Sequence, residues 1–268
     1  MDWTAAALGS LIGVVLALTG AGGGILAIPL LVLGMHMPVQ QAGPVGLAAV
    51  GIASAFGAAV GLKAGIVRYR AALLIGAAGM LMAPAGVALA QRLPDKPLLA
   101  VFALIMCWVA WRMLRPATAE HAGADAAPND QPCKVSSAGG RLVWTSSCAR
   151  SMASTGALSG LLSGLLGVGG GFVIVPALTH HTDLDMRSVQ ATSLAVIALV
   201  SVSGVSAAIW HGSVNGTVAM PFTAGATVAL LVAQRLAHHL PAAHLKLAFA
   251  CLCVLVACMM MLRAASIL

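Results

Sequence analysis

Two runs of glycine are the residues of this chain whose types and spacing could bind a ligand. Gly20-Ala21-Gly22-Gly23-Gly24 is followed by Pro29, and Gly167-Val168-Gly169-Gly170-Gly171 is followed by Pro176, 147 positions further along. Glycine is a poor helix former, so each run predicts an interruption of a helix. The next helix then starts with backbone N–H groups that have no intrahelical acceptor, and such groups bind anions. The sequence therefore predicts two anion-binding breaks.

The apolar composition places these breaks in a membrane. The chain of 268 residues is 60% hydrophobic and only 8% charged, with a mean hydropathy of +0.99. Soluble domains carry roughly 25% charged residues, and a bilayer core is spanned by roughly 20 apolar residues. We therefore expect an all-α polytopic membrane protein. Non-helical backbone at membrane depth is tolerated only within protein or beside a wet cavity, so the breaks should lie inside the bundle.

The glycine runs belong to an internal repeat. With the same offset of 147, Gly65 matches Gly212, and Leu93-Pro94 matches Leu240-Pro241. We expect two homologous halves of four apolar segments each: a first repeat over 1–115, a polar linker loop over 116–150, and a second repeat over 151–268. The expected segments are 8–35, 43–62, 71–91, 97–114, 152–179, 189–210, 217–234 and 243–262.

The two glycine segments either cross the membrane with a break or fold back as re-entrant hairpins. Each spans 28 residues, roughly 42 Å as one continuous helix, which exceeds the roughly 30 Å hydrocarbon core. The basic residues divide nine to five between the two sides if all eight segments cross. They divide eleven to three if the glycine segments are hairpins, with only Arg92, Lys96 and Arg263 on the minority side. Cytoplasmic loops are enriched in Lys and Arg, so the count favours hairpins and inverted repeats.

The apolar segments contain almost no ionisable side chains, because all seven carboxylates fall in termini or loops. A buried carboxylate relay or a dehydrated cation site therefore lacks ligands, which favours an anion held by backbone dipoles, amides and hydroxyls. Pro29 and Pro176 are expected in the first turn of the second half-helix, where a missing N–H costs little. The alternative for the glycines is tight helix crossing, and the alternative for the polar residues is helix capping. The candidate substrate-binding residues are Gly20, Gly22, Gly23, Gly24, Gln41, Gly167, Gly169, Gly170, Gly171, Gln190, Thr192 and Ser193.

Several other classes of protein are less well supported. The net charge of +7 is explained by cytoplasmic loops facing lipid, so no nucleic-acid partner is expected. No phosphate-binding G-x-x-x-x-G-K-[ST] motif occurs, and no convergent catalytic residues lie in the spans. The six cysteines show no disulfide framework, and Cys133 and Cys148 fall in the central loop, which we expect in the reducing cytoplasm. A transition-metal permease using His180, His181, His238 and His239 stays open as an alternative, as does a membrane-embedded enzyme.

These features resemble the sulfite exporter TauE/SafE family, also called the toluene sulfonate uptake permease family. The resemblance is carried by the duplicated G-x-G-G-G-(x)4-P segments, by Gln190-Ala191-Thr192-Ser193-Leu194-Ala195 and by the two Leu-Pro pairs. It implies a secondary transporter of the bacterial inner membrane, not an enzyme, that exports sulfite or a sulfonate without a cofactor. The first half departs from the pattern at Gly43-Pro44, where the second half has Thr-Ser. Proton coupling and a homodimer stay open.

Overall fold

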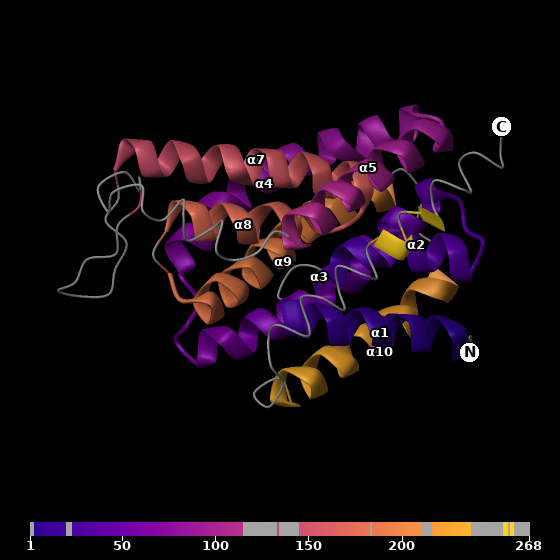
Figure 1. Cartoon of the computed structure of the whole chain (residues 1–268), viewed down its shortest axis with the longest axis horizontal. Helices are drawn as coiled ribbons and strands as arrows, with labels where there is room; N and C mark the ends of the chain where they lie inside the picture. The colour runs from indigo at the N-terminus through magenta and orange to yellow at the C-terminus, as the bar shows by residue number, and fades with distance from the viewer. Residues whose placement is uncertain are drawn as a thin grey trace.

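The structure is a computed structural model, and it describes residues 3–19, 23–114, 133, 145–182, 184–210, 216–236, 254–256, 258 and 259. Within this part the chain forms an all-α bundle, as expected (Figure 1). The predicted segment 243–262 lies largely outside the described residues. The helices are α1 (Trp3–Thr19), α2 (Gly23–Gly34), α3 (Val39–Lys63), α4 (Tyr69–Arg92), α5 (Asp95–Leu114), α7 (Ser146–Leu166), α8 (Gly171–His181), α9 (Met186–Trp210) and α10 (Gly216–Leu236).

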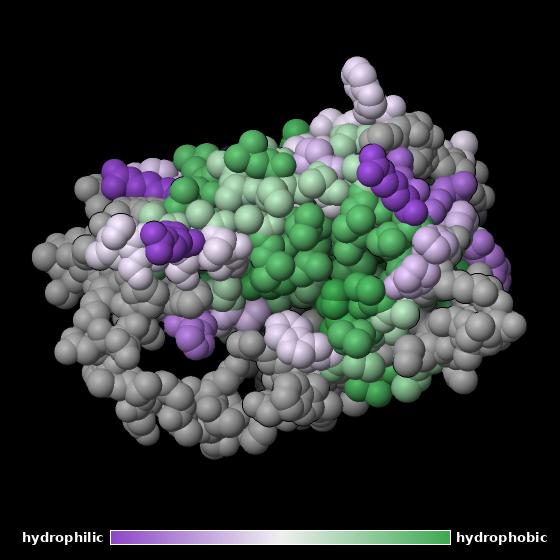
Figure 2. Space-filling model, turned by 90° about the horizontal axis from the view of Figure 1, so that it is seen from above, coloured by the Kyte–Doolittle hydropathy of each residue, from purple (hydrophilic) through white to green (hydrophobic). Residues whose placement is uncertain are grey.

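Four of these helices, α3, α4, α9 and α10, are long and apolar enough to cross a membrane. The helices α1, α2 and α8 are shorter, because the glycine runs divide the first and fifth expected segments. Large apolar side chains such as Leu81, Leu104 and Val202 are exposed, as the lipid-facing surface of a bundle requires. The face drawn in Figure 2 has apolar residues in a central band and hydrophilic residues toward both ends.

Both glycine runs interrupt helices. α1 ends at Thr19 before α2 begins at Gly23, and α7 ends at Leu166 before α8 begins at Gly171. The second break needs glycine, because Gly167, Gly169 and Gly170 have φ values of 67°, 79° and 69°.

The prolines sit further into the second half-helices than expected. Pro29 is the seventh residue of α2 and Pro176 is the sixth residue of α8, so both lie in the second turn. The expectation of a first-turn position was wrong. At this depth each proline removes a hydrogen bond from the helix instead of replacing an N–H group that has no acceptor.

The second glycine segment is a re-entrant hairpin. Cys133 forms a disulfide with Cys148 in the first turn of α7, and its backbone pairs with Thr182 just after α8. One residue thus touches both ends of the segment, which returns to the end of the bundle where it entered. In the first half, Gly34 at the end of α2 likewise lies against Leu8 near the start of α1. The hairpin arrangement is therefore the one that this chain adopts.

The two hairpins pack on the opposite half of the bundle in equivalent ways. Gly9 and Gly13 of α1 pack closely against the backbone of Phe222 and Ala226 in α10. The second hairpin makes the equivalent contacts, in which each glycine lies 147 residues later in the chain and each partner lies 147 residues earlier. Gly156 and Gly160 of α7 pack closely against the backbone of Ile75 and Gly79 in α4. The halves are therefore related by a pseudo-two-fold axis, and α1 runs parallel to α10 as α7 does to α4.

The hairpins enter from opposite ends of the bundle. The side-chain amide of Gln40 at the start of α3 donates to the carbonyl of Leu93 after α4, and this end is called the Leu93 end. At the other end, the backbone N–H of Arg68 before α4 donates to Thr192 near the start of α9, and this is called the Gly65 end after the α3–α4 turn. The α7–α8 hairpin opens to the Gly65 end and the α1–α2 hairpin to the Leu93 end, so the repeats are inverted (Figure 1).

Candidate functional site

The start of α2 meets the second break at the centre of the bundle. A Cβ atom on Gly24, at the start of α2, would overlap the carbonyl oxygen of Val168 in the second break. A Cβ on Gly169 would lie 2.9 Å from Ile197 and 3.2 Å from Val50. Val50 and Ile197 are themselves equivalent under the offset of 147 and come from the central helices α3 and α9. The start of α2 and the second break therefore converge where the pseudo-two-fold axis passes through the fold.

The second break offers donors more than acceptors. The carbonyl of Gly170 accepts hydrogen bonds from the N–H groups of Val173 and Ile174 and from the buried hydroxyl of Ser159 at 3.0 Å. No acceptor for the N–H groups of Gly169, Gly170 and Gly171 occurs within the part of the chain that the structure describes. Unpaired donors at a helix start, with the positive end of the helix dipole behind them, attract an anion.

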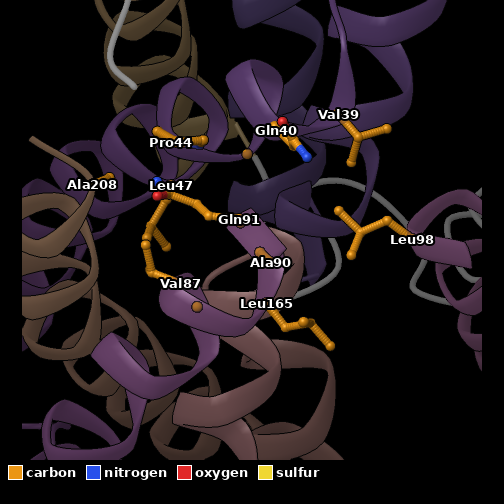
Figure 3. Close-up of a pocket in the computed structure, with 13 residues that line it drawn as sticks. Val39, Gln40, Pro44, Leu47, Val87, Ala90, Gln91, Leu98, Leu165 and Ala208 are labelled. Carbon is orange, nitrogen blue, oxygen red and sulfur yellow. The ribbon is translucent and has the colours of Figure 1, made fainter. Parts of the chain in front are cut away.

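A narrow cavity lies beside this break, toward the Leu93 end (Figure 3). The space open to the centre of a water molecule is about 20 Å³, which suffices for about one water. Gly164 and Gly167 of the second hairpin form one wall, and Gln40 and Gln91 bring amide groups from α3 and α4. The other lining residues are Val39, Gly43, Pro44, Leu47, Val87, Ala90, Leu98, Leu165 and Ala208.

Gln40, and not the predicted Gln41, is the glutamine of α3 that lines the cavity. Its neighbour Gln41 is exposed. Helical direction explains this difference, because adjacent residues of a helix point about 100° apart. Gln91 was also missed, since it lies in the last turn of an otherwise apolar helix and has no counterpart among the motifs.

Gly43 lies at a close approach that requires glycine at 167 and not at 43. A Cβ on Gly43 would lie 3.8 Å from the Cα of Gly167, which is an ordinary contact. A Cβ on Gly167 would overlap the backbone of Gly43, so α3 and the second break approach closely at this point. Under the offset of 147, Gly43 is equivalent to Gln190 and not to Thr192. The two halves therefore differ here by a glycine against a glutamine.

The polar residues of the second half lie near the Gly65 end. Thr192 and Ser193 are both fully buried. The Thr192 hydroxyl accepts a hydrogen bond of 3.1 Å from the backbone N–H of Arg68, and the Ser193 hydroxyl donates to the carbonyl of Gln190 at 2.8 Å. Thr192 thus joins the start of α4 to α9. Gly20 and Gly22 lie outside the described residues.

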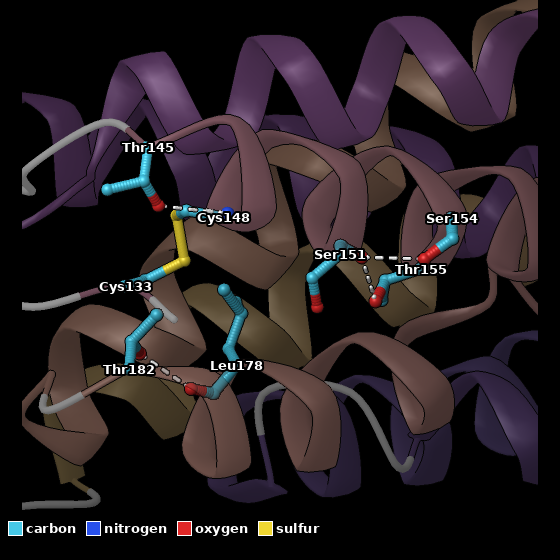
Figure 4. The surroundings of a disulfide bond; sticks show 8 residues. All are labelled: Cys133, Thr145, Cys148, Ser151, Ser154, Thr155, Leu178 and Thr182. Carbon is cyan, nitrogen blue, oxygen red and sulfur yellow. Dashed lines mark hydrogen bonds between the residues drawn. A yellow bond between two sulfur atoms is a disulfide. The ribbon is translucent and has the colours of Figure 1, made fainter. Parts of the chain in front are cut away.

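The disulfide between Cys133 and Cys148 overturns the expectation that the cysteines are unpaired (Figure 4). Their Cα atoms lie 5.1 Å apart and both residues are buried. The bond attaches a linker residue to the first turn of α7, where the Thr145 side chain caps the helix. Sequence spacing could not reveal this pair, because the two cysteines are 15 residues apart and only the fold brings them together.

The alternative of a metal permease depends on His180, His181, His238 and His239. His180 is exposed in the last turn of α8, and His238 and His239 lie outside the described residues. Among the residues that the structure describes, no three His, Cys, Asp or Glu side chains are grouped so that they could hold a metal ion.

An inverted repeat with interrupted helices at the bundle centre is typical of membrane transporters built on discontinuous helices. The chain belongs to the Sulfite exporter TauE/SafE family, whose pattern it matches over residues 5–260. It is 32% identical over 220 residues to a probable membrane transporter protein of Xylella fastidiosa strain 9a5c, covering 81% of this chain and 77% of the relative. A protein of the same description from strain Temecula1 is 33% identical with the same coverage. No solved structure matches the chain.

Proposed function

We propose that this protein is a secondary transporter that exports a small sulfur-containing oxyanion, sulfite or an organosulfonate. The observation that carries the proposal is that the N–H groups of Gly169, Gly170 and Gly171 have no acceptor among the described residues, close to the start of α2. The same chemistry is assigned to the first break at Gly20, Gly22, Gly23 and Gly24. Backbone donors bind an oxyanion without a buried charged residue, which suits spans that lack carboxylates and cations.

Binding and movement are coupled in this proposal. The cavity beside Gly167 has room for about one water in the present conformation, which is too little for a sulfite ion. The anion therefore reaches the breaks only when the halves move apart on one side. The helix pairs α1–α10 and α4–α7 each join a hairpin to the opposite half, so rocking about the pseudo-two-fold axis would open each end in turn.

The basic residues orient the proposed transporter. At the Gly65 end lie Lys63, Arg68, Arg70, Arg150, Arg187 and Arg235, whereas Arg92 lies at the Leu93 end. Positively charged loops face the cytoplasm, so we assign the Gly65 end and the central linker to the cytoplasmic side of a bacterial inner membrane. A proton gradient is the proposed driving force, since the chain carries no nucleotide-binding motif.

The test is the thermal stabilisation of purified protein by sulfite, compared with sulfate, a sulfonate and chloride. A ligand that binds the native state raises Tm in proportion to its affinity. We expect sulfite to raise the Tm of the wild type and to have a much smaller effect on Gly169→Ala. The control is Gly65→Ala, because Gly65 has the same kind of positive φ, 69°, but open space around it and no place in the break. An equal sulfite shift in both variants, or none in the wild type, would refute the proposed site.

A further inference from the structure

Three buried serine hydroxyls, those of Ser54, Ser163 and Ser201, have no hydrogen-bond partner within the described part of the chain. Ser54 in α3 is 0% exposed and Ser201 in α9 is 3% exposed, and neither Oγ atom has a partner within the described part of the chain. Several other serines of the bundle are hydrogen-bonded: the Ser10 hydroxyl, for example, donates to the carbonyl of Ala6 at 2.9 Å. A buried polar group without a partner destabilises the fold, so its presence calls for a function.

Of these three serines, Ser54 and Ser201 occupy equivalent positions of the two halves, whereas the position equivalent to Ser163 is Leu16. Ser54 and Ser201 are separated by 147 residues, the offset of the repeat. Each follows by four residues, or about one helical turn, a side chain that contacts the second break at Gly169: Ser54 follows Val50 and Ser201 follows Ile197. The Ser201 side chain also packs against the backbone of Gly51 in the opposite half. The pair therefore lies between the halves, about one turn from the second break.

We propose that Ser54 and Ser201 bind the transported oxyanion, each hydroxyl donating a hydrogen bond to one of its oxygens as the anion moves between the two breaks. The inference rests on the proposed function, because it assigns two side chains to the same transport path. Hydrogen bonds to a charged acceptor are stronger than neutral ones, so two hydroxyls contribute to affinity without a fixed charge that would trap the anion.

The closed packing explains why the hydroxyls are unpaired in this conformation. A Cβ on Gly51 would lie 2.9 Å from the Ser201 hydroxyl oxygen, which leaves no room for an anion between α3 and α9 there. The hydroxyls gain a partner only when the halves separate and the anion enters. A ligand shifts a conformational equilibrium by its differential affinity, and these donors supply such a difference between closed and open states.

The test compares Ser54→Ala, Ser201→Ala and the double variant with wild type, in detergent and in proteoliposomes. We expect each single variant to weaken sulfite binding about tenfold or more, as for a lost hydrogen bond to a charged group. Their Tm without sulfite should be unchanged or higher, because each change removes a buried hydroxyl that lacks a partner. A purely structural serine would lower Tm instead. The matched control is Ser206→Ala, since Ser206 lies on α9 but is exposed and bonds to the carbonyl of Ser203.

The outcomes separate this inference from the proposed function. If wild type binds and transports sulfite and the double variant does so equally well, the serine assignment is wrong and the backbone site stands. If the wild type shows no response to sulfite, the proposed function itself fails. A lower Tm with unchanged sulfite affinity would show that the hydroxyls serve packing alone, which also overturns the inference.

Discussion

Gly24 and Val168 belong to different halves of the chain, and their backbones touch: a Cβ on Gly24 would overlap the Val168 carbonyl oxygen. This contact joins the two interrupted helices directly. It also explains why the first run keeps glycine at a position that lies within helix α2 and has no need of a positive φ.

Gly24→Ala should therefore disrupt the centre of the bundle. We expect a loss of stability of about 1–3 kcal/mol, as for other overpacked interiors, together with loss of sulfite binding. The measurement is Tm and the sulfite-induced shift in detergent. Gly34→Ala serves as the control because its Cβ would meet only the flexible end of Leu8. Similar losses in the two variants would contradict a special role for the Gly24–Val168 contact.

The pseudo-symmetry predicts paired effects at the helix crossings. Gly13→Ala and Gly160→Ala each place a methyl group against a backbone carbonyl, of Ala226 and Gly79 respectively. We expect both to lower Tm by comparable amounts, because small residues allow membrane helices to approach closely. Gly216→Ala, which meets nothing within 4 Å, should leave Tm nearly unchanged. A large effect at only one crossing would show that the two interfaces are not equivalent.

Thr192 was predicted to bind substrate, and its hydrogen bond to Arg68 allows that role to be separated from a structural one. Thr192→Val removes the acceptor for the Arg68 N–H at the start of α4 and should lower stability by about 1 kcal/mol. Thr192→Ser keeps the hydroxyl and should retain most of that stability. If Thr192 also binds the anion, the rise in Tm that sulfite causes will be smaller in Thr192→Val than in the wild type. An unchanged sulfite shift would limit Thr192 to joining the two helices.

The disulfide provides a test of orientation. In the proposed orientation the Gly65 end, and with it Cys133 and Cys148, faces the cytoplasm, where thiols are kept reduced. We therefore expect the pair to be reduced in rapidly quenched growing cells and to form a disulfide on oxidation. Alkylation followed by mass spectrometry measures both states, with Cys107, an exposed free thiol, as the internal reference. A pair that is already oxidised in untreated cells would place this end in the periplasm.

Closing the Cys133–Cys148 bond should also stabilise the hairpin. Cross-links of this loop length contribute about 3 kcal/mol in the chain-entropy account. Cys148→Ser should therefore lower the Tm of the oxidised protein and leave that of the reduced protein nearly unchanged. Equal effects in both states would mean that the residue acts through packing rather than through the bond.

Much of the fold could be predicted because it depends on local chemistry. The apolar segments, the breaks at the glycines and the inverted halves follow from hydropathy, from the cost of glycine in a helix and from the count of basic residues. Helix ends were predicted less well: α3 begins at Val39 rather than at 43, and both prolines lie a turn deeper than expected. Helix starts are set by tertiary contacts such as the one between Gln40 and Leu93, which no local pattern encodes.

The sequence by itself determined that this protein spans a membrane, that it repeats after 147 residues and that each half contains one interrupted helix, because composition and glycine act on nearby backbone. Only the tertiary structure decided which groups come together. It brought Gly24 to Val168, Gln40 and Gln91 to one cavity, and Cys133 to Cys148. It also left the hydroxyls of Ser54 and Ser201 buried without a partner among the described residues. These relationships depend on how helices distant in the chain cross, and packing across the two halves fixes that geometry.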